Sequence, residues 1–137
     1  MKKWTTDSWK NFPAKHLPVY QDEAELNSVL EKVRNIIGTN QKVMVHLDSD
    51  HTHEHVLKEL NLYSKFVGYG HYLICGDTII EYIPQQTHRP RSWGQGNNPK
   101  TALDEFLIDN NEFVIDSQFD NKRLIGNQPG GYLKRIN

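Results

Sequence analysis

Acidic and histidine side chains follow two short apolar runs of the chain. The first run ends at Leu47 and is followed by Asp48 and, three residues later, by His51. The second run, residues 71–76, ends at Asp77. Two carboxylates that lie close together can share a hard divalent cation, and a histidine beside them can hold or accept a proton. These residue types therefore suggest a metal-assisted or acid–base site as a hypothesis.

The side chains can meet only if the two apolar runs are neighbouring parallel strands. The sequence predicts a strand at 43–48, a helix at 52–66 and a second strand near 71–76. This strand–helix–strand order is typical of parallel pairing. The carboxyl ends of adjacent parallel strands lie at one edge of a sheet, with the strands about 4.8 Å apart. We therefore expect Asp48 and Asp77 to lie close together at that edge.

A purely structural interpretation of the same stretch stays open. Aspartate is common after a strand, and Asp50 could cap the helix that follows. His51 and His55 have the i, i+4 spacing that zinc proteins use, but the complete H-E-x-x-H pattern is absent. We expect His53 and His55 to be exposed polar residues, and His46 to be a half-buried residue of its strand.

The rest of the chain predicts two more helices and a final strand pair. A helix at 22–37 carries apolar residues at helical spacing and ends at Gly38. Another helix begins at Pro99, with Asn98 as its cap. The stretches "EFVIDSQF" and "RLIGN" suggest two strands joined by a turn at 120–121. The tail "PGGYLKRIN" is expected to turn and then extend.

This order of elements predicts an α/β fold class, with a mostly parallel sheet and a C-terminal antiparallel hairpin. We assign residues 22–137 to a single α/β domain and residues 1–21 to an irregular N-terminal arm, where Pro13 and Pro18 oppose a helix. The polar loop 84–98 holds two Arg, a Trp and two Gly ahead of a helix. It could bind an anion or cover the strand ends as a lid, although ordinary loop chemistry also explains its composition.

Composition excludes several classes of function. The net charge is −1, with 16 basic and 17 acidic residues mixed along the chain, so no basic stripe indicates a nucleic-acid partner. No stretch is apolar enough for a membrane span, and no apolar leader follows the first three residues. The single Cys75 excludes an internal disulfide and fits a reducing compartment, so we expect a cytoplasmic protein. Its apolar surroundings mark Cys75 as a core residue and not a nucleophile.

Several motifs in combination resemble the cephalosporin hydroxylase family, which is related to sugar and macrolide O-methyltransferases. They are L-D-S-D-H at 47–51, V-L-x-E-L-x-x-Y at 56–63, Y-L-I-C-G-D-T at 72–78, N-P with A-x-x-E-F-L within 98–107, and P-G-G-Y-L-x-R at 129–135. The resemblance covers roughly residues 41–137. It implies a Rossmann-like methyltransferase fold that binds S-adenosylmethionine and a magnesium ion.

The resemblance assigns roles to the residues at the strand ends. It implies that Asp48 and Asp77 are metal ligands and that His51 lies close to the reacting group. The implied activity is a metal-assisted, S-adenosylmethionine-dependent methyl transfer to a hydroxyl of a small molecule, either a sugar or a natural-product scaffold. The family has a Glu–Asp pair where this chain has Gly76–Asp77. We therefore expect weakened binding of Mg²⁺.

The resemblance also implies a glycine-rich cofactor half that should precede the first strand. Only 22 residues separate Tyr20 from Val43, whereas a strand–helix–strand unit needs about 30. We therefore expect a partial Rossmann-like fold in which the exposed strand 43–48 lacks a neighbour and supports a homo-oligomer. The alternative function is a non-catalytic remnant domain that binds a small polar ligand, or a partner chain through the open sheet edge. A metal-dependent hydrolase is a third hypothesis.

Overall fold

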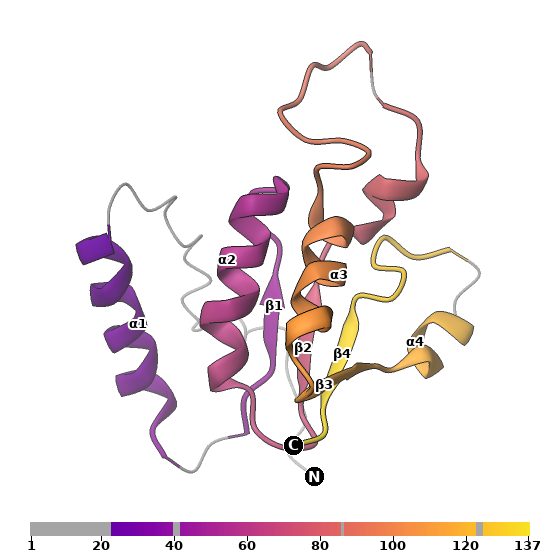
Figure 1. Cartoon of the computed structure of the whole chain (residues 1–137). Coiled ribbons are helices and arrows are strands. Elements are labelled where there is room, and N and C mark those ends of the chain that lie inside the picture. The colour runs from indigo at the N-terminus through magenta and orange to yellow at the C-terminus, as the bar shows by residue number, and fades with distance from the viewer. Residues whose placement is uncertain (1–22, 40–41, 86, 123–124) are drawn as a thin grey trace, which may run out of the picture.

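The computed structural model describes residues 23–39, 42–85, 87–122 and 125–137 (Figure 1). The arm expected at 1–21 lies outside these residues. The elements in chain order are α1 (Glu23–Ile37), β1 (Val45–Leu47), α2 (His53–Tyr63), η1 (Ser64–Phe66), β2 (Tyr72–Cys75), η2 (Thr78–Tyr82), α3 (Pro99–Asp109), β3 (Phe113–Ile115), α4 (Ser117–Asn121) and β4 (Tyr132–Arg135). None of the described helices has the length and apolar composition that crossing a membrane requires.

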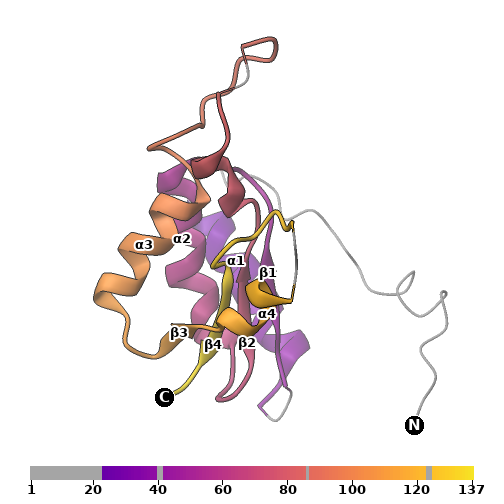
Figure 2. The same ribbon diagram turned by 90° about the vertical axis from the view of Figure 1, so that its right-hand side faces the viewer.

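The strands form one four-stranded mixed sheet in the order β1-β2-β4-β3. β1 and β2 are parallel, as predicted, whereas β4 runs antiparallel to both β2 and β3. α2 and α3 cover one face of the sheet, and α4 lies on the other (Figure 2). The α/β class is therefore confirmed, but only one of the three strand pairs is parallel, so the expectation of a mostly parallel sheet is wrong for the described residues.

The predicted antiparallel pairing at the C-terminus is confirmed, but the predicted bounds of its strands and the turn between them are wrong. Residues 117–121 form helix α4, and the partner of β3 is β4, with Ile115 opposite Leu133. The Asp116 side chain accepts a hydrogen bond from the Gln118 backbone N–H at 3.1 Å, which caps this short helix. The ring of Phe119 then stacks on Tyr132 with centroids 4.6 Å apart. Local capping and this aromatic contact favour a helical turn over an extended strand.

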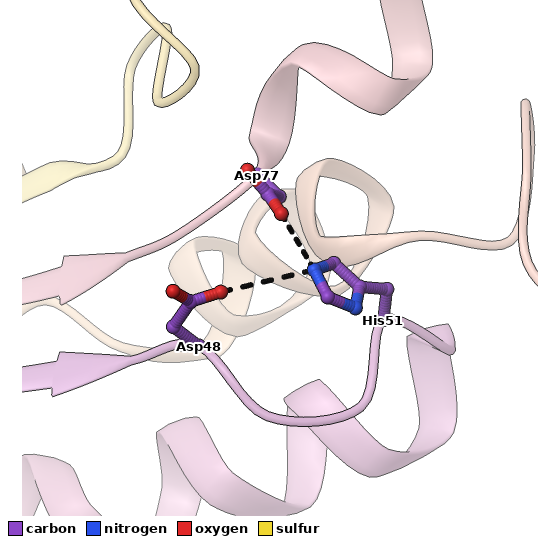
Figure 3. A group of neighbouring side chains, drawn as sticks. All are labelled: Asp48, His51 and Asp77. Atoms are coloured by element: carbon purple, nitrogen blue, oxygen red, sulfur yellow. Dashed lines mark hydrogen bonds and ion pairs between the residues drawn. The ribbon is translucent and has the colours of Figure 1, made fainter.

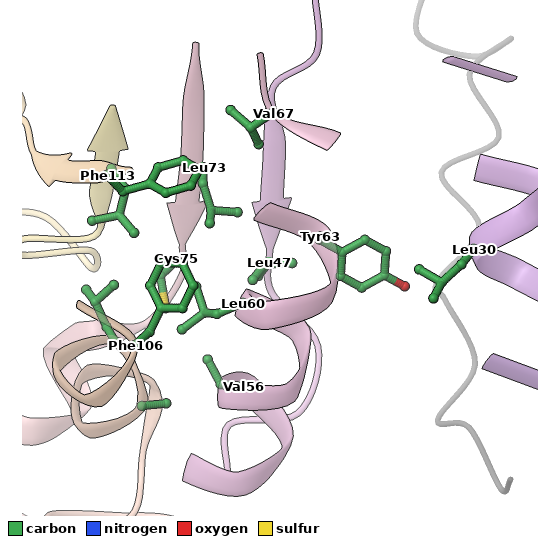
Figure 4. Packing of buried hydrophobic residues seen from close by; sticks show 13 residues of the cluster. Leu30, Leu47, Val56, Leu60, Tyr63, Val67, Leu73, Cys75, Phe106 and Phe113 are labelled. Carbon is green, nitrogen blue, oxygen red and sulfur yellow. The ribbon is translucent and has the colours of Figure 1, made fainter. Parts of the chain in front are cut away.

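The hydrophobic core lies between the α2–α3 layer and the sheet (Figure 4). Leu60, Leu73, Leu103 and Leu133 are fully buried there. Cys75 belongs to the same cluster, and its burial raises the pKa of the thiol to about 12. Cys75 is therefore a core residue, as expected from its apolar neighbours.

The β1 side of the molecule is less completely packed. α1 lies outside α2 (Figure 1), and Leu30 is buried on it, whereas Ile36 is 71% exposed. Beside this helix, β1 forms the end of the sheet, and Met44 just before it is 65% exposed. The apolar stripe predicted for residues 22–37 is therefore only partly buried, because no described element covers the outer side of β1.

Candidate active site

The parallel pairing of β1 and β2 brings the two predicted aspartates together. Leu47 lies opposite Cys75, and the Gly76 N–H donates to the Leu47 carbonyl at 2.8 Å, so the chain leaves both strands at the same edge. Each of Asp48, His51 and Asp77 offers an atom that lies within 4.8 Å of the atoms offered by the other two (Figure 3). The predicted convergence of the three side chains is confirmed.

His51 joins the two carboxylates. Its Nε2 lies 2.6 Å from Asp77 Oδ2 and 3.8 Å from Asp48 Oδ1. The second oxygen of Asp77, Oδ1, accepts a hydrogen bond from Asn127 Nδ2 at 3.1 Å. Asp77 is also the only described non-glycine residue with a positive φ, at 50°, immediately before η2. Backbone conformation and two hydrogen bonds thus fix the direction of this carboxylate; nothing in the sequence marked Asn127.

Gly76 sets how closely the two strand ends approach. A Cβ atom at this position would lie 2.8 Å from the Leu47 carbonyl oxygen and 3.4 Å from both Cβ and Oδ1 of Asp48. Real Cβ atoms do not approach a backbone oxygen so closely, so a side chain here would push the strand ends apart. In this chain, glycine at position 76 therefore permits the close approach of the residue 76 backbone to Leu47 and Asp48.

The donor set of this cluster suits a divalent cation. It consists of two carboxylates and one imidazole, and oxygen ligands are preferred by Mg²⁺, whereas imidazole also suits transition metals. The side chain of Asp48 is 56% exposed, that of Asp77 31% and that of His51 21%, so an ion can reach all three from solvent. The residues present therefore fit a metal, with Asp48 as the most accessible ligand.

A second polar cluster holds the loop between β1 and α2. Ser49 Oγ donates to Glu59 Oε2 at 2.9 Å, and His55 Nε2 lies 3.1 Å from Ser49 Oγ and 3.4 Å from Glu59 Oε1. Glu59 is only 5% exposed. The hydrogen bond to Glu59 raises the pKa of His55. His55 Nε2 therefore serves as a donor to Glu59 and is poorly placed to activate Ser49, so this cluster gives no support to a hydrolase.

The other histidines separate into structural roles. His53 links α2 to α3 through Thr101 Oγ1 at 2.9 Å and Glu105 Oε2 at 3.1 Å. The expectation that His53 and His55 are exposed is thus wrong, because both side chains are partly buried by these partners. His46 is exposed and not half-buried. Since α2 begins at His53, His51 and His55 do not share a helix face, and the zinc-type spacing has no structural counterpart.

The loop before α3 reaches the site through Trp93. The Trp93 ring lies 5.1 Å from the His51 ring, and the Arg91 guanidinium lies 5.2 Å from the Trp93 ring. Asn98 caps α3 as predicted, accepting from the Lys100 N–H at 2.8 Å. The amide of this fully buried Asn98 also donates to Gly94 O at 2.7 Å and to the Glu81 carboxylate.

Glu81 holds the same loop from the opposite side. Its Oε2 accepts from the Gly96 N–H at 2.9 Å as well as from Asn98. These two hydrogen bonds lower the pKa of Glu81, with the backbone donor Gly96 as the larger cause. Hydrogen bonds with Glu81 and Asn98 thus hold the turn that carries Trp93. Sequence reasoning identified the loop but not the contact of Trp93 with His51.

A cavity of about 360 Å³ lies beside η2, α4 and the segment before β4. The backbone carbonyl of Asn127 accepts from the N–H of Ile79, a cavity residue, at 3.2 Å, and the Asn127 side chain donates to Asp77. The size lies within the range of small-molecule pockets. The lining residues are Ile79, Asp120, Ile125, Gly126, Gln128, Pro129 and Tyr132.

An acid–histidine cluster at the carboxyl edge of a parallel strand pair is a usual place for ligand chemistry in α/β proteins. The family model for rhamnosyl O-methyltransferase/CmcI matches residues 14–136. The chain therefore belongs to this family, which is of the O-methyltransferase type, and the resemblance seen in its motifs is confirmed. No curated protein and no solved structure gives a significant match. The family implies a small-molecule substrate and the use of S-adenosylmethionine.

Proposed function

We propose that this chain is a metal-assisted O-methyltransferase-type protein that acts on a hydroxyl of a sugar or natural-product scaffold. The observation that supports this function is the meeting of Asp48, His51 and Asp77 at one edge of the sheet. In this proposal residues 22–137 act as one domain, because β4, near the C-terminus, pairs with both β2 and β3. Its single cysteine, buried and free, favours action in the cytoplasm.

Each residue of the cluster has a distinct role in this proposal. Asp48 and Asp77 would hold Mg²⁺, which when bound lowers the pKa of a neighbouring hydroxyl as a Lewis acid. His51 takes the proton of the acceptor hydroxyl at Nε2. In the present arrangement Nε2 donates to Asp77, because a carboxylate can only accept. His51 can accept the hydroxyl proton at Nε2 only as the neutral tautomer that carries its proton on Nδ1, with the Nε2 bond to Asp77 released; Trp93 packs beside the ring.

The described residues do not fit the methyl donor S-adenosylmethionine. Cofactors in α/β sheets bind in a crevice where the strand order reverses, between parallel strands on both sides. Among the described residues, β1 has a parallel neighbour only on the β2 side, and no crevice of this kind is formed. We derive no step from the donor and propose that its site lies beyond the outer edge of β1, outside the described part of the sheet.

The same edge supports a homo-oligomer and a second candidate function. In the residues that the structure describes, no strand pairs with the outer side of β1, and exposed strand edges readily pair with another chain. A second copy pairing at residues 43–48 would complete the sheet. The alternative is a non-catalytic domain that binds a small polar ligand or a partner chain there. Gly76 in place of a glutamate ligand favours this alternative.

Calorimetric titration with S-adenosylmethionine, with and without Mg²⁺, separates the two functions. Saturable binding at micromolar concentration supports the methyltransferase. Lack of binding up to millimolar concentration, with Mg²⁺ present, would reject it for this chain and leave the binding domain. The Asp48→Asn variant serves as the comparison, because it removes a proposed metal ligand and leaves the remainder of the sheet unchanged.

A further inference from the structure

We propose that Arg91 and Trp93 form a recognition element for the acidic group of a hydroxylated ring, so that the acceptor is a ring hydroxyl compound carrying a carboxylate. The placement of the ligand's hydroxyl rests on the proposed function of His51 and the two aspartates. The binding of the ligand's carboxylate by Arg91 rests on the geometry of the loop alone.

The guanidinium of Arg91 is available to a ligand. Arg91 is exposed, and its guanidinium lies over the ring of Trp93, 5.2 Å from the ring centroid. Arg135, by contrast, is engaged within the fold: it donates to Glu112 at 2.8 Å and to Val67 O at 2.6 Å. A guanidinium that lies over an indole ring can still offer its N–H fork to a ligand, and this fork matches the two oxygens of a carboxylate.

The position of Arg91 relative to the chemistry sets the shape of the ligand. Trp93 contacts both groups, since its ring is 5.1 Å from that of His51 and 5.2 Å from the Arg91 guanidinium. The guanidinium and the imidazole therefore lie no farther apart than these two distances combined, which one substituted ring can span. A ligand that places a hydroxyl at His51 can reach Arg91 with a substituent on the far side of its own ring.

The charges give such a ligand one orientation. The two carboxylates of Asp48 and Asp77 would be neutralised by a bound Mg²⁺, so no net charge attracts an acidic group at the His51 end, whereas Arg91 attracts it at the other end. The loop is also held in place before any ligand arrives, by Asn98 and Glu81. Little ordering cost is then left for binding, because the recognising side chains start from an anchored backbone.

Matched ring compounds test this inference. In calorimetric titrations with Mg²⁺, we expect 3,4-dihydroxybenzoate to bind roughly fivefold tighter than catechol, the gain of one exposed ion pair. Arg91→Gln should abolish this preference and leave catechol binding unchanged. Arg89→Gln, an exposed arginine two residues away, should keep it. Equal affinity for the two compounds, or a preference that survives in Arg91→Gln, would overturn the proposal.

Benzoate separates this inference from the proposed function, because it has no hydroxyl. We expect benzoate to perturb the Arg91 side-chain NMR signal in the wild type and in Asp48→Asn, but to bind more weakly to Arg91→Gln. The absence of any benzoate effect on the Arg91 signal would also overturn the recognition element. Catechol binding that is the same in Asp48→Asn would instead count against the proposed metal chemistry and leave the role of Arg91 intact.

Discussion

Asp77 is the residue on which the candidate site converges. His51 and Asn127 bond its two oxygens, and Asp48 approaches the same histidine from β1. Replacing Asp48 by Asn keeps the shape but removes the charge, so we expect the thermal stabilisation by Mg²⁺ to disappear. A thermal shift assay over a range of Mg²⁺ concentrations measures this.

Asp104→Asn is the matched control, because Asp104 is exposed on α3 and pairs with Lys100. Its Mg²⁺-induced shift should equal that of the wild type. An unchanged shift in Asp48→Asn would mean that the ion binds elsewhere.

Gly76 is the residue whose lack of a side chain lets the aspartates meet. Gly76→Ala places a Cβ 2.8 Å from the Leu47 carbonyl oxygen, so we expect a loss of about 1–3 kcal/mol in the free energy of unfolding. Urea denaturation measures the loss. Gly94→Ala is the control, since its Cβ would make only ordinary contact with the end of Gln85 at 3.7 Å. Equal stability of wild type and Gly76→Ala would contradict the close approach of the strands.

His55 and Glu59 give the protein a pH-dependent contribution to stability. Because the pKa of His55 is raised above its ordinary 6.5 in the folded state, the pairing stabilises the fold fully below that value and is lost as pH rises through the raised pKa. We expect Glu59→Gln to return the His55 titration, followed by NMR, toward 6.5. The stability difference between wild type and variant should be larger at pH 6 than at pH 8.5. A His55 titration that is the same in both proteins would rule out the pairing.

At the scale of elements, the turn before α3 is held by a single buried side chain. Asn98 caps the helix and bonds both Gly94 and Glu81. Asn98→Ala should therefore cost about 1–2 kcal/mol of stability and increase hydrogen exchange over residues 91–97. Denaturation and hydrogen-exchange mass spectrometry measure the two effects. Asn111→Ala, at an exposed position, should change neither; unchanged exchange in Asn98→Ala would show that other contacts hold the turn.

At the scale of the whole molecule, the open side of β1 governs assembly. If residues 43–48 pair with a second copy, light scattering after size exclusion should give a dimer or a larger species. Met44→Lys, at a position that is 65% exposed beside β1, should shift the mass toward the monomer. Val114→Lys on β3, the opposite edge, should leave the mass unchanged. A monomeric wild type would refute this assembly.

Much of the site could be predicted from the sequence, because the apolar runs and capping residues that position it are local patterns. Apolar runs followed by Asp48 and Asp77, with a helix between them, indicated parallel strands and hence a shared edge, which the structure confirms. Asn98 and Pro99 marked the start of α3 for the same reason, since capping depends on neighbouring residues. The motifs within residues 47–135 were enough to indicate the family.

Contacts between distant segments were decided only by the tertiary structure. Asn127 bonds Asp77, 50 residues away, and Trp93 in the loop before α3 packs against His51 in the loop before α2. No spacing rule predicts either contact. The strands of the predicted antiparallel hairpin were misplaced for the same reason, because the stacking of Phe119 on Tyr132 and the pairing of β3 with β4 depend on long-range packing. Sequence patterns specify which face of an element is apolar and where it ends. Which distant side chain completes a site depends on how the helices, strands and loops pack against one another in the tertiary structure.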